Sequence, residues 1–251
     1  MSTKRPLVLI DLDDTLFQTA RKMNNKVSWH TATLDVNGSP NGYMSNVQKS
    51  FVEWLLASAD VVPVTARSVE AYQRVNLPFA NGAICANGGV ILQSNGFRDC
   101  DWHAQMTEML ASYQDRLHAL SKQTLEIGAE LGYSLRGWVV EEAGLANYVV
   151  TKHNEKSDDV LTSVLSEVES RGLLTDIYVH GNGNNLAFIP VALSKRNAVQ
   201  EWISRDIALN GERPLLGFGD SLSDLGFMDE CHWWGTPINS QLAAFVRERV
   251  S

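Results

Sequence analysis

The sequence lacks the features of secreted and membrane-spanning proteins. It has three cysteines in 251 residues, an odd number with no metal-ligand spacing: Cys85, Cys100 and Cys231. Reduced thiols in a cytosolic protein are the simplest interpretation, because secreted proteins usually pair their cysteines in disulfides. No stretch approaches the ~20 apolar residues that span a bilayer, and the first apolar run is too short for a signal peptide. We therefore predict a soluble, cytoplasmic protein.

Positive charge is also scarce. Lys and Arg number 21 against 29 Asp and Glu, which gives a formal net charge of −8. A nucleic-acid or acidic-membrane surface needs a basic patch, so we predict neither partner. An acidic protein can still bind a small phosphorylated metabolite when a divalent cation lies between the charges. The sequence leaves the oligomeric state open.

Short apolar runs recur along the chain, and helical patterns separate some of them. Such runs are typical of parallel strands that are buried on both faces. Strands that alternate with helices predict a doubly wound α/β core with a Rossmann-like parallel sheet. The two tryptophans of the last run are expected to fill the edge of this core. The runs are "PLVLIDL" (6–12), "ADVVPVT" (59–65), "GAICA" (82–86), "PLLGFGD" (214–220) and "HWWGTPI" (232–238).

The middle of the chain has a different pattern. An amphipathic helix is predicted over 100–131, and a second one begins near Ser157. Each is followed by two strand-like segments, which are "GWVVEEA" and "ANYVVTKH", then "TDIYVHG" and "NLAFIPV". The order α-β-β-α-β-β predicts a small antiparallel sheet backed by two helices, so we expect a core domain of residues 1–90 and 191–251 and an inserted domain of 91–190. Residues 18–44 are polar with turn signals, and we predict a long flap or hairpin there.

Three aspartates interrupt the first apolar run, "LVLIDLDDTLF" at residues 7–17. Asp11 and Asp13 follow the first predicted strand, at the edge where open α/β sheets bind ligands. While the chain stays extended, residues 11 and 13 point the same way. Two carboxylates at such a short distance raise each other's pKa unless a cation lies between them or one of them is protonated. The pair therefore suits a Mg²⁺ site or a general acid.

Three further segments each end in a polar group that suits phosphate or Mg²⁺. The run "VVPVTARS" ends in Thr65, and "LSKRNAV" places Lys195 at a predicted helix start. The run "LLGFGDSLSD" ends in a glycine turn with Asp220 and Asp224 beyond it. Buried strand ends rarely tolerate uncompensated carboxylates, which favours a functional role for the aspartates at 11, 13 and 220.

Taken in order, these segments resemble the four motifs of the haloacid dehalogenase superfamily of phosphohydrolases. The matching residues are "DLDDT", the threonine of "VVPVT", the lysine of "LSK", and "GDSLSD". The resemblance covers the whole chain, because one branch of the superfamily carries an α/β cap between the second and third motifs. "CANGGVIL" is similar to the entry into that cap, and "NLAFIPVALSKRNAV" to the exit from it. The familiar members of this branch are sugar-phosphate phosphatases. We expect the cap of this chain to close over the substrate and supply specificity.

The resemblance implies four catalytic residues. Asp11 matches the nucleophile that attacks phosphorus and forms an aspartyl-phosphate. Asp13 matches the acid that protonates the leaving oxygen and then activates water. Thr65 and Lys195 match the residues that hold the phosphoryl oxygens of the substrate.

The resemblance also implies a magnesium site. Its ligands would be Asp11, the backbone carbonyl of Asp13, and Asp220. Asp224 would support the metal through water or an oriented hydrogen bond.

Other residues near these motifs leave alternatives open. Arg67 could bind substrate or form a surface salt bridge, and Asn87 could face the substrate or hold a tight turn. Ser223 stands where this branch often has asparagine and could donate to phosphate or water. Asp14 stands where many members have glycine and is expected to face away and cap a backbone N–H. Thr15 is expected to fix the turn after the strand.

The sequence thus predicts a Mg²⁺-dependent phosphomonoesterase for a small phosphorylated metabolite, such as a sugar phosphate. The nearest alternative is a phosphosugar mutase on the same scaffold, which would pass the phosphoryl group to another hydroxyl. A DxD glycosyltransferase offers no reason for Thr65, Lys195 and "GDSLSD" at their positions. A non-catalytic binding module is the remaining alternative, because a fold does not guarantee an activity.

Overall fold

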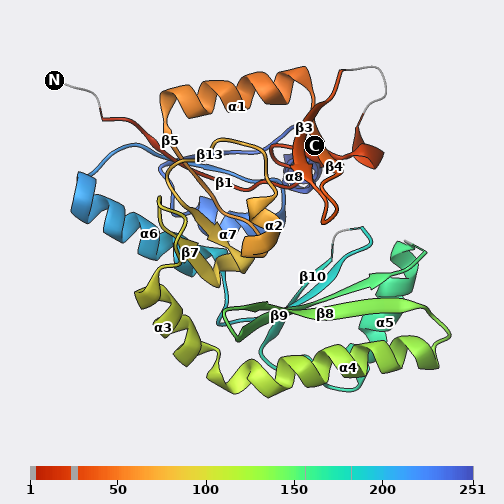
Figure 1. Cartoon of the computed structure of the whole chain (residues 1–251). Coiled ribbons are helices and arrows are strands. Elements are labelled where there is room, and N and C mark those ends of the chain that lie inside the picture. The colour runs from red at the N-terminus through yellow and green to blue at the C-terminus, as the bar shows by residue number, and fades with distance from the viewer. Residues whose placement is uncertain (1–3, 24–27, 156, 182, 251) are drawn as a thin grey trace. The chain divides into compact units, whose positions relative to one another are not determined.

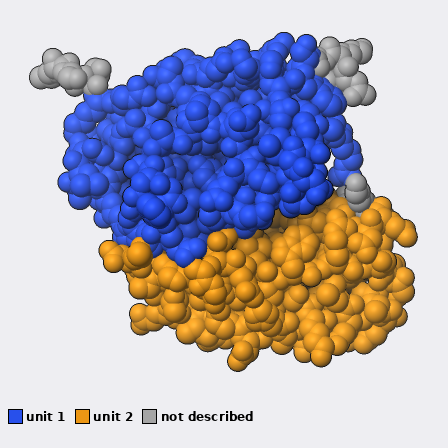
Figure 2. All heavy atoms as spheres, in the orientation of Figure 1, with its two compact units in different colours: residues 1–99, 194–251 blue, residues 100–193 orange. Residues whose placement is uncertain are grey.

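The computed structural model describes residues 4–23, 28–155, 157–181 and 183–250, and its elements are drawn in Figure 1. The chain separates into two compact units, which Figure 2 shows in blue and orange. The core unit comprises Met1–Asp99 and Ser194–Ser251, and the inserted unit comprises Cys100–Leu193. The domain boundaries predicted from the sequence, at residues 90/91 and 190/191, stay a prediction.

A four-stranded parallel sheet forms the centre of the core unit. Its order is β13-β12-β1-β5, and each neighbouring pair is parallel. The central strand β1 is buried at every position, which explains its unbroken apolar sequence. The predicted α/β class with a parallel sheet is confirmed. The strands are β1 (Leu7–Ile10), β5 (Asp60–Pro63), β12 (Leu215–Phe218) and β13 (Trp233–Gly235).

Two of the predicted strands behave differently from expectation. "GAICA" forms β6 (Ala83–Cys85), which pairs antiparallel with β7 (Val90–Leu92) and meets the parallel sheet through one isolated bridge, Val64 to Ile84. The core-edge role predicted for Trp233 and Trp234 is wrong, because these residues are 63% and 46% exposed. They lie on β13, the short edge strand of the sheet.

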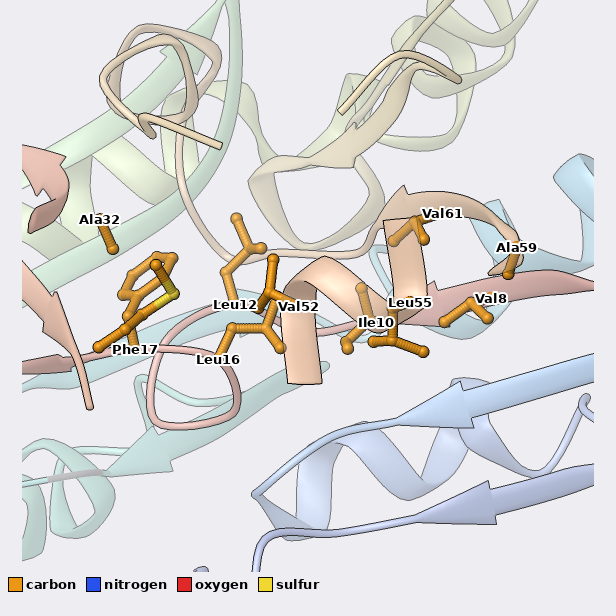
Figure 3. Close-up of a cluster of buried hydrophobic side chains, with 11 residues drawn as sticks. Val8, Ile10, Leu12, Leu16, Phe17, Ala32, Val52, Leu55, Ala59 and Val61 are labelled. Carbon is orange, nitrogen blue, oxygen red and sulfur yellow. The ribbon is translucent and has the colours of Figure 1, made fainter. Parts of the chain in front are cut away.

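Buried apolar side chains fix β1 and the loop after it. Figure 3 shows Val8 and Ile10 of β1 in one cluster with Leu12, Leu16 and Phe17 of the loop. Helix α1, which begins with a capping box at Ser45, adds further residues to this cluster. The loop that carries the aspartates is therefore anchored by its own apolar residues. The helices of the core unit are α1 (Asn46–Ser58), α2 (Val69–Gln73), α6 (Lys195–Asn210), α7 (Leu225–Met228) and α8 (Gln241–Val250), and its 3-10 turns are η1 (Ala20–Lys22), η2 (Ala86–Gly88) and η4 (Leu222–Asp224).

The polar segment 18–44 contains the predicted hairpin. Strands β3 (His30–Leu34) and β4 (Pro40–Met44) pair antiparallel, and β2 (Gln18–Thr19) pairs with the other edge of β4. The result is a small sheet of order β2-β4-β3. Part of the predicted flap, residues 24–27, lies outside the described residues.

The inserted unit has the predicted order of elements. Its antiparallel sheet has the order β10-β11-β9-β8, and α4 packs on β8 and β9 while α5 packs on β9. The single helix predicted over 100–131 is divided into α3 and α4 by a 3-10 turn, η3 (Ala111–Tyr113). None of the helices in the described part of the chain has the length and apolar character needed to cross a membrane. The elements are α3 (Cys100–Met109), α4 (Gln114–Glu130), β8 (Leu135–Glu142), β9 (Leu145–His153), α5 (Asp158–Ser170), β10 (Ile177–Gly181) and β11 (Leu186–Pro190).

Candidate active site

Polar side chains follow three neighbouring parallel strands of the core unit. Asp11 comes directly after β1, and its N–H donates to Phe218 O on β12 at 2.8 Å. Thr65 comes just after β5, and Asp220 just after β12. Parallel strands end at the same edge of a sheet, so this edge collects the polar groups of three motifs. All three side chains are buried, at 5%, 1% and 7% exposure for Asp11, Thr65 and Asp220.

Lys195 joins two of the aspartates. It is the first residue of α6, whose N-cap Ser194 accepts from the N–H of Asn197 at 3.1 Å. Lys195 Nζ donates to Asp11 Oδ1 and to Asp224 Oδ1, each at 2.7 Å. Burial alone would lower the pKa of Lys195, but the two carboxylates raise it above its ordinary value. A buried, fully charged ammonium therefore lies beside Asp11.

Asp224 is held by hydrogen bonds on both oxygens. Its Oδ2 accepts from Ser221 Oγ at 2.7 Å, from the Ser221 N–H at 3.0 Å and from the Asp220 N–H at 3.2 Å. Burial would raise its pKa, but Lys195 and these donors hold it below its ordinary value. Sequence reasoning missed Ser221, although the spacing Ser-x-x-Asp in "SLSD" is the signature of a capping box. The bonds to Ser221 fix the glycine turn that presents Asp220.

Thr15 lies between the carboxyl groups of Asp11 and Asp220. Its Oγ1 donates to Asp11 Oδ2 at 3.1 Å and lies 3.5 Å from Asp220 Oδ1. Burial raises the pKa of Asp11, as do the charges of Asp224 and Asp220, while Lys195 opposes them. Burial, followed by the charges of Asp224 and Asp14, raises the pKa of Asp220 from 3.8 to about 7. The hydroxyl of Thr15 therefore contacts the carboxyl groups of Asp11 and Asp220 instead of only fixing the turn.

This carboxylate cluster fits a divalent metal ion. Oxygens of Asp11, Asp220 and Asp224 lie within 4.8 Å of one another. Among the described residues, Lys195 is the lysine that bonds to this cluster of three buried carboxylates, so their negative charge exceeds the positive charge bonded to it. Burial, followed by the charges of Asp224 and Asp14, raises the pKa of Asp220. A hard cation such as Mg²⁺ prefers oxygen ligands of this kind. Because Lys195 and the Ser221 turn engage both oxygens of Asp224, that residue suits a supporting position better than direct ligation.

Asp13 lies apart from the buried cluster. Its side chain is 52% exposed, so the argument from a buried strand end does not apply to Asp13. The chain leaves the extended conformation after β1 and turns, which separates the environments of Asp11 and Asp13. Arg67 binds Asp13 through two hydrogen bonds of 2.7 Å. Asp14, which has a φ of 62°, pairs with Lys22 of η1 at 2.6 Å, a contact that the sequence did not suggest.

The remaining predicted residues surround Thr65 or follow β12. Thr65 Oγ1 accepts from the Arg67 N–H at 3.1 Å, and Thr65 O accepts from the Asn87 N–H at 3.1 Å. Asn87 has a left-handed φ of 56° inside η2, which agrees with the tight-turn alternative. Ser223 Oγ lies 2.8 Å from Ser221 Oγ. Binding of substrate by Arg67, Asn87 and Ser223 stays a prediction.

The raised pKa of Asp220 predicts a stability that depends on pH. Between about pH 4 and pH 7 the unfolded chain has Asp220 ionised while the folded protein keeps it protonated, so folding loses stability as the pH rises, and the loss is complete above about pH 7. We expect Asp220→Asn to raise the free energy of unfolding by about 1 to 3 kcal/mol at pH 8 in EDTA, with a smaller gain at pH 5.5. Denaturant titrations at the two pH values test this. The prediction would be contradicted if the variant gained the same free energy of unfolding at both pH values, or lost stability at both.

Comparison with solved structures shows which fold this is. Sucrose-phosphatase from Synechocystis sp. PCC6803, in complex with sucrose and phosphate, matches with a TM-score of 0.59 at 16% identity, over 98% of this chain and 88% of that one. The C-terminal domain of C. albicans trehalose-6-phosphate phosphatase matches with a TM-score of 0.57 at 14% identity, over 90% and 74%. A haloacid dehalogenase-like hydrolase from Bacteroides thetaiotaomicron matches with a TM-score of 0.51 at 12% identity, over 99% and 100%. No family model and no curated protein matches the chain. The chain has the haloacid dehalogenase-like fold with an inserted α/β unit, as its motifs predict.

Proposed function

We propose that this protein is a Mg²⁺-dependent phosphomonoesterase that hydrolyses a small phosphorylated metabolite through an aspartyl-phosphate. The observation that carries the proposal is the position of Asp11 among Lys195, Thr15 and two further buried carboxylates. A carboxylate nucleophile needs a neighbouring cation for the phosphate it attacks and a fixed orientation. Lys195 at 2.7 Å meets the first requirement, and the hydrogen bond from Thr15 at 3.1 Å meets the second.

The residues of the core unit suggest how the two steps divide. In the first step Asp11 attacks phosphorus, the bond to the leaving oxygen breaks, and Asp13 gives that oxygen a proton. Lys195 and the Thr65 hydroxyl stabilise the charge that develops on the phosphoryl oxygens. In the second step Asp13 takes a proton from water, which hydrolyses the aspartyl-phosphate and frees Asp11.

The carboxylate cluster would hold the metal. Asp11, Asp220 and the backbone carbonyl of Asp13 would be its protein ligands, and Asp224 would orient the cluster through Lys195 and Ser221. When bound, Mg²⁺ neutralises carboxylate and phosphate charge that would otherwise repel. The close approach of three buried carboxylates supports this assignment.

Sugar phosphates are the substrate class that we propose. Support comes from the fold shared with a sucrose-phosphatase and a trehalose-6-phosphate phosphatase. The free cysteines of the described chain support a reducing compartment, so we propose the cytoplasm as its location.

A panel of phosphorylated metabolites tests the proposal, with phosphate release as the readout. We expect release with Mg²⁺ and a loss of more than about tenfold in EDTA, restored by added Mg²⁺. Absence of release from every ester would contradict the proposal. Incubation with a hexose bisphosphate separates hydrolysis, which frees phosphate, from a mutase, which transfers it to another position.

A further inference from the structure

Arg67 is held firmly beside the phosphate-binding threonine of the proposed site. Its N–H donates to Thr65 Oγ1 at 3.1 Å, and its carbonyl accepts from the Ala86 N–H at 2.7 Å. Both backbone groups are therefore fixed within the core unit. The side chain is 17% exposed, so the guanidinium is largely withdrawn from solvent.

The guanidinium is committed to residues of this chain. Nε donates to Asp13 Oδ2 and Nη2 to Asp13 Oδ1, each at 2.7 Å, which is the parallel two-bond arrangement of a strong arginine–carboxylate pair. Nη1 donates to Ala71 O at 3.2 Å, and the guanidinium carbon lies 5.2 Å from the centre of the Phe17 ring. Phe17 is buried, so the guanidinium has a rigid support.

Asp13 has weaker restraints of its own. It lies on a turn, its side chain is half exposed, and its backbone forms one isolated bridge to Phe17. A single exposed ion pair contributes little to stability, but a planar two-bond pair on a supported arginine fixes orientation. Arg67 therefore connects the exposed turn of the first motif to the buried threonine of the second.

We propose that Arg67 is a positioning residue, which acts on the reaction by orienting the carboxyl group of Asp13 and not by binding the phosphate. This role rests on the proposed function. Because Asp13 serves the leaving oxygen in the first step, loss of orientation affects esters in proportion to their need for a proton on that oxygen. An alkyl phosphate needs the proton, whereas 4-nitrophenyl phosphate has a leaving group stable enough without it.

The experiment compares kcat/KM for the two esters, since this constant covers only the steps up to departure of the leaving group. We expect Arg67→Gln to lower kcat/KM for the alkyl ester by about 10- to 100-fold and for 4-nitrophenyl phosphate by less than about 3-fold. In an Asp13→Asn background, Arg67→Gln should add less than about 2-fold for either ester. The matched control is Arg74→Gln, which removes an arginine at the end of α2 that pairs with Glu70. It should leave kcat/KM unchanged for both esters.

The outcomes separate the possible roles. Equal losses for both esters that persist in the Asp13→Asn background would overturn the proposal, because they indicate direct contact of Arg67 with phosphate. Absence of wild-type turnover of both esters would contradict the proposed function and this role with it. If thermal unfolding shows that Arg67→Gln is not folded, Arg67→Lys decides the matter, because it keeps the charge and loses the two-bond geometry. Arg67→Lys should still lower kcat/KM for the alkyl ester more than for 4-nitrophenyl phosphate. Equal losses of kcat/KM for both esters would again overturn the role.

Discussion

Replacing Asp11 by asparagine is expected to lower phosphate release by more than about 1,000-fold while the protein stays folded. Asparagine keeps the shape of the side chain and its hydrogen bond with Thr15, but it cannot form an acyl phosphate. It also removes one of three buried carboxyl groups whose charges repel one another, so the variant should stay folded. Steady-state turnover of 4-nitrophenyl phosphate with Mg²⁺ measures the effect, and thermal unfolding measures the integrity of the variant.

An exposed aspartate supplies the control for this substitution. Asp229 follows α7 in the same core unit, and Asp229→Asn makes the same chemical change away from the cluster. Its turnover should stay within about twofold of the wild type. Turnover by a folded Asp11→Asn protein at a rate near that of the control would remove Asp11 from the role of nucleophile.

Replacing Lys195 by methionine is expected to destabilise the protein by about 3 to 5 kcal/mol at pH 8 in EDTA. The ammonium bridges Asp11 and Asp224 at 2.7 Å each, and both carboxylates stay buried when it is removed. Charges without a partner in a buried site carry a large desolvation penalty. Turnover should fall as well, because the variant loses the cation beside the phosphoryl group.

The pH dependence of this destabilisation has a definite sign. Without the ammonium, the folded-state pKa values of Asp11 and Asp224 rise, so each carboxyl group can accept a proton as the pH falls. The loss relative to wild type should therefore be smaller at pH 5.5 than at pH 8. Denaturant titrations measure it, with Lys49→Met as control, since Lys49 makes an exposed pair with Glu53 and should cost less than about 1 kcal/mol. A loss equal to that of the control would show that Lys195 does not compensate the buried carboxylates.

Much of the core unit follows from local patterns in the sequence. The run that became β1 is apolar at every position because both faces of the strand are buried, and β5 and β12 share that pattern in part. Lys195 was predicted at a helix start, and the structure begins α6 there. These predictions succeed because strand burial and helix capping depend on residues close together in the chain.

Contacts between distant segments were not predictable in the same way. Trp233 and Trp234 have the composition of a core strand, yet they are exposed because nothing in an apolar run indicates that its strand lies at the edge of the sheet. The pairing of Asp13 with Arg67 joins residues 54 positions apart, and the period of a strand could not reveal that the chain turns after Asp11. Lys22 of η1 likewise pairs with Asp14, a contact that depends on the turn between them and not on a local pattern.

By itself the sequence determined which chemical groups this protein holds at the ends of its strands, because an apolar run followed by a carboxylate or hydroxyl is a local pattern. Only the tertiary structure decided which of those groups are buried and which of them form ion pairs. It buried Asp11, Asp220 and Asp224 together, with Lys195 bonded to two of them, and left Asp13 half exposed and paired with Arg67. The reason is physical, since burial and the distances between charges depend on how strands far apart in the chain pack together.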